Sequence, residues 1–114
     1  MGKLKTEYPC ALILSHNLIG GKWKLRILWH IIHGDNRFSL LLKAIPDITQ
    51  KELSSQLKEL EKNHILKRTV IDDNPPKVVV YHIAEEYSEL VSIIENVCTF
   101  TKGYAKNNRI KIED

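Results

Sequence analysis

The stretch DITQKELSSQLKELEKNHILKR, residues 47–68, carries the pattern that decides the fold. At about 100° per residue, Leu53, Leu57 and Leu60 fall on one side of a helix. The opposite side holds basic and small polar side chains: Lys51, Ser54, Ser55, Lys58 and Lys62. One face is therefore apolar and the other is basic and free of acids. We expect the leucines to be buried and the lysines to face an anionic partner.

The residues around this helix predict how it begins and what precedes it. Thr49 and Glu52 have the Thr-x-x-Glu spacing of a capping box, which satisfies unpaired N–H groups at a helix start. We therefore expect a helix over 49–62, with Asn63 as the left-handed residue that closes it. The preceding segment SLLLKAI, residues 39–45, is typical of a short helix stopped by Pro46. Two short helices with a tight connection predict a helix-turn-helix unit.

The rest of the chain predicts a hairpin and three flanking helices. ILKRTVI and KVVVYHI are rich in β-branched residues and flank the turn residues DDNPP, so a hairpin is expected over 66–83. Apolar periodicity predicts helices at 9–19, within 22–33 and at 85–105. The result is a mainly α (α+β) fold, a winged helix-turn-helix domain in which the hairpin is the wing. We expect one domain over 1–105 and a frayed tail at 106–114.

Composition favours a small, folded cytoplasmic protein. The chain has 114 residues, 43% of them hydrophobic, and a formal charge of +3. It contains no apolar run near the roughly 20 residues needed to span a bilayer, and its N-terminus lacks the apolar core of a secretory signal. Cys10 and Cys98 match no metal or redox spacing, so both are expected to be reduced thiols, with Cys98 at a helix contact. A domain this small has little apolar surface to spare, which favours a homodimer.

Double-stranded DNA is the partner that fits the basic helix face. The B-DNA major groove admits one α-helix between two rows of phosphates, so the inserted face must lack acids. Following the capping residue Thr49, the first two turns are placed to reach base edges, through Gln50, Lys51, Ser54 and Ser55. We expect phosphate contacts from Arg37, Lys58, Lys62, Lys67, Arg68 and Lys77. The alternatives are an ordinary solvated helix face and a winged helix that docks an acidic protein.

Other kinds of chemistry find little support. No nucleophile with its base, phosphate loop or carboxylate pair is recognisable, so we expect no enzyme and no cofactor. His30 and His33 form an i, i+3 pair that could ligate a metal, but Asp35 is the only Cys, Asp or Glu at a useful sequence spacing, so we expect no metal. Aromatic residues at helical spacing are expected to be core and not a ligand pocket: Trp23, Trp29 and Phe38.

Three segments carry a family resemblance: NLIGGKWKLRIL, RFSLLLKAIPDITQKELSSQLKELEKNHIL and DDNPPKVVVYHI. Over about residues 8–100 the chain resembles the HxlR family of bacterial transcriptional regulators, relatives of the MarR regulators. The resemblance implies a dimeric winged-helix protein that binds pseudo-palindromic promoter DNA and represses or activates nearby genes. The N-terminal helix and the long C-terminal helix would then pair across a two-fold axis.

The same resemblance raises a role for Cys10. Many members of the family carry an N-terminal cysteine. In some of these proteins the thiol senses oxidants or electrophiles such as quinones and aldehydes. Here the usual Cys-Pro order is reversed, as Pro9-Cys10. A helix that begins at Pro9 places Cys10 in its first turn, where the helix dipole favours an anion such as a thiolate. The alternative is a small residue in a dimer contact.

The segment before the last helix departs from the family pattern. Ala84 and Tyr87 stand where the family usually has a capping threonine and a glycine. Alanine cannot cap a helix. We therefore expect the last helix to start differently.

Overall fold

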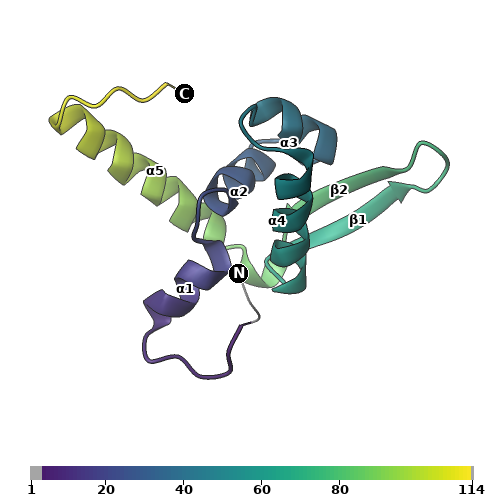
Figure 1. The fold of residues 1–114 in the computed structure, drawn as a ribbon, viewed down its shortest axis with the longest axis horizontal. Helices are drawn as coiled ribbons and strands as arrows, with labels where there is room; N and C mark the ends of the chain where they lie inside the picture. Colours follow the sequence, from purple (N-terminus) through teal and green to yellow (C-terminus); the bar gives the residue numbers. More distant parts are fainter. Residues whose placement is uncertain (1–3, 114) are drawn as a thin grey trace.

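Five α-helices and one β-hairpin form the part of the chain that the computed structural model describes, residues 4–113. The elements are α1 (Ala11–Ile19), α2 (Lys24–Ile32), α3 (Phe38–Ala44), α4 (Gln50–Lys62), β1 (Leu66–Asp72), β2 (Val78–Ile83) and α5 (Leu90–Asn107). In Figure 1, α2, α3 and α4 form the centre, the hairpin projects to one side and α5 to the other. The predicted winged helix-turn-helix fold is confirmed. No helix within residues 4–113 combines the length and apolar character needed to cross a bilayer.

The capping box predicted at the start of α4 is present. The Glu52 backbone N–H donates to the Thr49 hydroxyl oxygen at 3.0 Å, and the Thr49 N–H donates to Glu52 Oε1 at 3.0 Å. Below it, Leu53, Leu57 and Leu60 are buried. The cap and the leucines together orient α4, so its polar arc faces outward.

α4 ends at Lys62 as predicted, but the left-handed residue comes one position later than predicted. Asn63 has a φ of −86°, and the left-handed residue is His64, with a φ of 65°. The Ile65 N–H donates to the Leu60 carbonyl at 3.0 Å, and Ile65 is buried. The left-handed conformation occurs at His64 because the backbone must turn there to direct the next side chain, Ile65, into the core.

The wing is an antiparallel pair of strands with its base in the core and its tip in solvent. Leu66 pairs with Ile83, and the register continues to Val70 opposite Val79, with an irregularity before Asp72. Tyr81 also donates its backbone N–H to the Asn36 carbonyl at 2.8 Å. The base of the wing is therefore attached to the loop between α2 and α3, beside the helix-turn-helix.

The core lies where α2, α3, α4, the wing base and the start of α5 meet. Its buried members are Trp23, Ile27, Leu28, Ile31, Leu41, Ile45, Ile48, Leu53, Leu57, Leu60, Ile65, Leu66, Leu90 and Ile94. Trp29 and Phe38 are half-buried against this cluster. The expectation of aromatic core residues therefore holds fully for Trp23 and partly for the other two.

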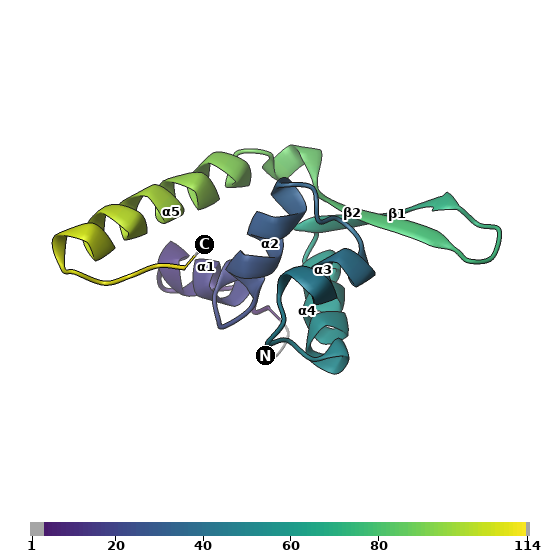
Figure 2. The same ribbon diagram turned by 90° about the horizontal axis from the view of Figure 1, so that it is seen from above.

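Both ends of the last helix differ from the predicted 85–105. A 3₁₀ turn occupies Glu85–Tyr87, with the Tyr87 N–H donating to the Ala84 carbonyl, and α5 begins only at Leu90. α5 starts late because the methyl group of Ala84 cannot accept the hydrogen bond that would cap a longer helix. At the other end α5 continues through Asn107, so the predicted tail boundary moves by two residues. The Ile110 N–H then donates a hydrogen bond to the Ala105 carbonyl at 2.8 Å, and the chain turns back toward α2 (Figures 1 and 2).

Helix α1 also starts later than predicted. It begins at Ala11, and Cys10 is the extended residue before it, not a member of its first turn. Every side chain of α1 is at least partly exposed, and Leu12 is 76% exposed. An apolar helix packed so lightly on its own chain has a face left over for another molecule.

Candidate DNA-binding surface

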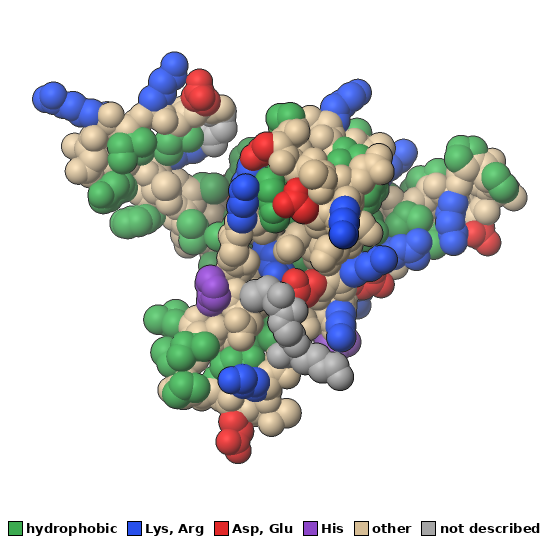
Figure 3. All heavy atoms as spheres, in the orientation of Figure 1, with side chains coloured by type: hydrophobic (Ala, Val, Ile, Leu, Met, Phe, Trp, Pro, Cys, Tyr) green, Lys and Arg blue, Asp and Glu red, His purple; other side chains and the backbone are tan. Residues whose placement is uncertain are grey.

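The polar arc of α4 is exposed, as the sequence predicts. Gln50, Lys51, Ser55, Lys58 and Lys62 are all exposed, and Ser54 is half-buried. Figure 3 shows Lys and Arg side chains gathered over α4 and between α4 and the wing. Thr49 is exposed as well, but its hydroxyl oxygen accepts the capping hydrogen bond. Thr49 therefore fixes the start of the helix.

The structure brings three of the predicted phosphate contacts to one groove. This groove, of about 570 Å³, lies between the start of α3 and the wing. Its lining residues are Arg37, Phe38, Ser39, Arg68, Pro76, Lys77, Val78, Val79 and Tyr81. Arg37 precedes α3, Arg68 lies on β1 and Lys77 follows the hairpin turn. Cations from three separate segments thus face one hollow between the start of α3 and the wing, an arrangement suited to a sugar-phosphate strand.

Lys67 lies apart from this groove. Successive strand residues point to opposite faces, so Lys67 is on the other side of β1 from Arg68. Its Nζ is 3.7 Å from Glu86 Oε1. Both side chains are exposed, so the pair is worth little and leaves the lysine able to turn to a phosphate.

The wing tip carries carboxylates beside the predicted phosphate contact Lys77. Asp72 and Asp73 lie at the turn, and Lys77 Nζ is 3.8 Å from Asp73 Oδ1. Two carboxylates make the tip less suited to phosphate than the sides of the hairpin. Their proximity to the groove follows from the hairpin turn, so the DDNPP sequence already contained this signal.

Two acids at the start of α4 are held by hydrogen bonds. Arg26 forms two bonds of 3.0 Å to the Asp47 carboxylate, which lower the pKa of Asp47 and raise the pKa of Arg26. The backbone N–H and then the hydroxyl of Thr49 lower the pKa of Glu52. Both carboxylates therefore remain ionised at mildly acidic pH, where they continue to accept these hydrogen bonds.

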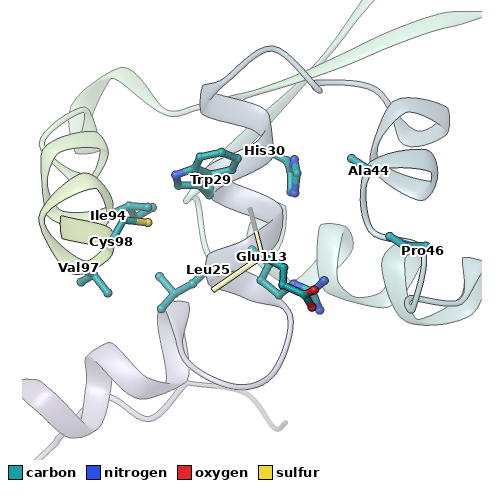
Figure 4. A pocket seen from close by; sticks show the side chains of 10 residues that line it. Leu25, Trp29, His30, Ala44, Pro46, Ile94, Val97, Cys98 and Glu113 are labelled. Carbon is teal, nitrogen blue, oxygen red and sulfur yellow. The ribbon is translucent and has the colours of Figure 1, made fainter. Parts of the chain in front are cut away.

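A second hollow, of about 550 Å³, lies between α2 and α5 (Figure 4). Leu25 and Trp29 of α2 face Ile94, Val97 and Cys98 of α5 across it. Cys98 is half-buried there, at the helix contact that was predicted for it. Trp29 thus lines a cavity, which the expectation of a purely core role missed.

His30 and His33 are directed to separate acids. His30 Nδ1 lies 3.1 Å from Asp35 Oδ2, and His33 Nε2 lies 3.2 Å from Glu95 Oε1. Residues 4–113 contain no group of three or more His, Cys, Asp or Glu side chains that could hold a metal. The two histidines therefore serve as links between side chains of this chain.

Comparison with known proteins places this chain among transcriptional regulators. The profile of a family described as HxlR-like helix-turn-helix matches residues 18–109. The HTH-type transcriptional regulator YtcD of Bacillus subtilis (strain 168) is 40% identical over 96 residues, 84% of this chain and 75% of that protein. A crystal structure of the HTH-type transcriptional regulator ytcD matches with a TM-score of 0.76 and 36% identity, over 85% of this chain and 98% of that one. The redox regulator HypR in its oxidised form matches with a TM-score of 0.69 and 30% identity, over 92% and 99%.

Proposed function

The chain belongs to the HxlR-like helix-turn-helix family of transcriptional regulators, and from this premise we propose that it acts as a homodimer on a pseudo-palindromic operator. It is a DNA-binding regulator and not an enzyme. One observation carries the proposal: α4 presents an exposed arc of lysines and serines, held outward by three buried leucines. We also propose that it acts in the cytoplasm, where the DNA is.

Contacts to the bases and to the backbone divide along α4. Gln50, Lys51, Ser54 and Ser55 lie in its first two turns, the part of a recognition helix that reaches base edges. Gln can pair with adenine and Lys with the acceptors of guanine. Phosphate contacts are assigned to Arg37, Lys58, Lys62, Lys67, Arg68 and Lys77. The groove that joins Arg37, Arg68 and Lys77 supports this assignment, because one backbone strand can meet all three.

The dimer is supported by apolar side chains that face solvent in the isolated chain. Ile93, Val97, Phe100 and Tyr104 recur on α5 at spacings of three and four residues and are all exposed. With the exposed side chains of α1, they offer a surface for a second copy of the chain. Such a dimer would place two α4 helices about 34 Å apart, one turn of DNA.

Lys51→Ala and Lys77→Ala are expected to weaken DNA binding in different ways. Lys51→Ala should cost about 1–3 kcal/mol on the operator and relax the preference at one base position, because it removes a base contact. Lys77→Ala should weaken operator and random DNA alike, because it removes a phosphate contact. Fluorescence anisotropy with both duplexes measures the difference. Equal losses on the two duplexes for Lys51→Ala would remove Lys51 from the base-reading set.

Salt dependence tests the function itself. Counterion release predicts that affinity for DNA falls steeply as salt rises, while preference for one sequence persists. Genomic footprinting with the purified protein would supply that sequence. A protein that showed no sequence preference, and whose basic arc instead bound an acidic protein, would exclude the proposal in favour of the protein-docking alternative.

A second candidate function is thiol-based sensing of electrophiles or oxidants through Cys10. Two observations favour it: Cys10 is exposed directly before α1, and the structural relative HypR is named a redox regulator. Because α1 contributes to the proposed dimer surface, a modified Cys10 would alter the dimer and hence the separation of the two α4 helices. A shift of a few ångströms would break the register with the two half-sites.

Cys10→Ser is expected to abolish any response of operator binding to diamide or methylglyoxal. The wild-type protein should change its operator affinity on treatment, since the modified residue lies at the proposed dimer surface. Cys98→Ser is the matched control, because Cys98 is half-buried and should leave the response intact. A wild-type protein whose affinity does not change on treatment would end the sensing proposal.

A further inference from the structure

Lys24 is the one charged side chain that is buried within residues 4–113, with 1% of its surface exposed. Its Nζ lies 2.9 Å from Oε2 of Glu59, which is on the recognition helix α4, 35 positions away in sequence. Removing a charge from water is costly, and a buried ion pair regains only part of that cost. A pair in this position therefore calls for a role besides stability.

The flank of α4 that Glu59 occupies is the flank held against the start of α2. Glu52 and Glu59 are seven residues apart, about two helical turns, so they lie on the same side of α4. Glu59 bonds to Lys24, the first residue of α2, and Glu52 accepts the backbone N–H of Thr49 in the cap. One turn of this flank is thus held by the start of α2 and the other by the cap of α4.

The same contacts control the charge that α4 presents. The segment 47–62 contains four acidic residues and three lysines, so its formal charge is not basic. Three of those acids have partners on α2 or in the cap: Asp47 with Arg26, Glu52 with Thr49, and Glu59 with Lys24. Of these contacts, Lys24–Glu59 is the most buried, with its two side chains 2% and 20% exposed, and it is the one that reaches the C-terminal half of α4.

We propose that Lys24 is a positioning residue for DNA recognition, whose ion pair with Glu59 fixes the rotation of α4 about its axis. This inference rests on the proposed DNA-binding function. The buried leucines decide which face of α4 points outward, and the short, directional ion pair adds a contact on the flank that fixes the rotation of the helix more finely. A small rotation would move the side chains of the first two turns away from the base edges while leaving the lysines close to phosphates.

The variant that tests this is K24M/E59Q. Methionine is close to lysine in length and glutamine has the shape of glutamate, so the volume is kept while both charges are lost. The net charge of the protein is unchanged. Binding to random DNA should therefore match the wild type, whereas the ratio of operator to random affinity should fall about tenfold, the scale of one lost base contact. A purely stabilising pair would leave this ratio unchanged.

The measurement is fluorescence anisotropy at fixed salt, with a duplex selected from a random library by the wild-type protein and with an unselected duplex. Thermal unfolding followed by circular dichroism establishes that each variant is folded at the assay temperature. K24M alone leaves Glu59 charged and unpaired beside the DNA, so its affinity for both duplexes should fall. K106M, which removes an exposed lysine of α5, is the control and should keep the wild-type ratio.

The outcomes separate this inference from the proposed function. A folded K24M/E59Q protein with the wild-type ratio would overturn the positioning role while the wild-type preference for its operator stands. A wild-type protein with no preference for any duplex would overturn the proposed function and the positioning role together. A tenfold fall in the ratio with unchanged binding to random DNA is the result we expect.

Discussion

Replacing Phe100 by aspartate is expected to convert the protein from a dimer to a monomer and to lower operator affinity by about 10²- to 10⁴-fold. Phe100 is 72% exposed in the middle of the apolar stripe of α5 and lies next to the Tyr104 ring, with centroids 6.5 Å apart. In the proposed dimer this side chain is buried, and a carboxylate there would be desolvated without a partner. Two separate monomers then lack the additional affinity that a dimer gains by binding both half-sites of the operator at once.

Sedimentation equilibrium measures the mass of the protein in solution, and fluorescence anisotropy measures its affinity for the operator. Thr99→Asp is the matched control, because Thr99 is exposed on the same helix but about 100° away from Phe100 around its axis. It introduces the same charge and should leave the dimer intact. A Phe100→Asp protein that remained a dimer would show that the two copies pair through another surface.

Replacing Leu53 by alanine is expected to lower the free energy of unfolding by about 2–5 kcal/mol. Leu53 is fully buried in the first turns of α4, where it packs into the core beneath the capping box. Its truncation removes apolar contacts and leaves a cavity that surrounding helices fill only in part. Urea unfolding at fixed protein concentration gives the value, since the stability of a dimer depends on concentration.

Ser55→Ala is the control for this substitution. Ser55 is exposed on the polar arc of the same helix, so its change should alter the free energy of unfolding by no more than about 0.5 kcal/mol. It should affect DNA binding instead. A Leu53→Ala protein as stable as Ser55→Ala would contradict the view that the leucine face anchors α4.

The predictions that succeeded rest on interactions between residues close in sequence. The capping box of Thr49 and Glu52 joins residues three apart, and the leucine face of α4 follows from spacings of three and four. Those that failed concern helix ends. His64 in place of Asn63 closes α4, and Leu90 in place of residue 85 begins α5, because at each point the burial of a neighbouring side chain or the lack of a cap decides.

The amino-acid sequence by itself determined the helix-turn-helix, the wing and the acid-free outer face of α4, since local periodicity, capping and turn residues act within one or two helical turns. The tertiary structure alone decided which distant residues share a site. It joins Arg37, Arg68 and Lys77 in one groove and pairs Lys24 with Glu59 across 35 positions. Such contacts depend on how whole elements pack, and no spacing along a single chain records that.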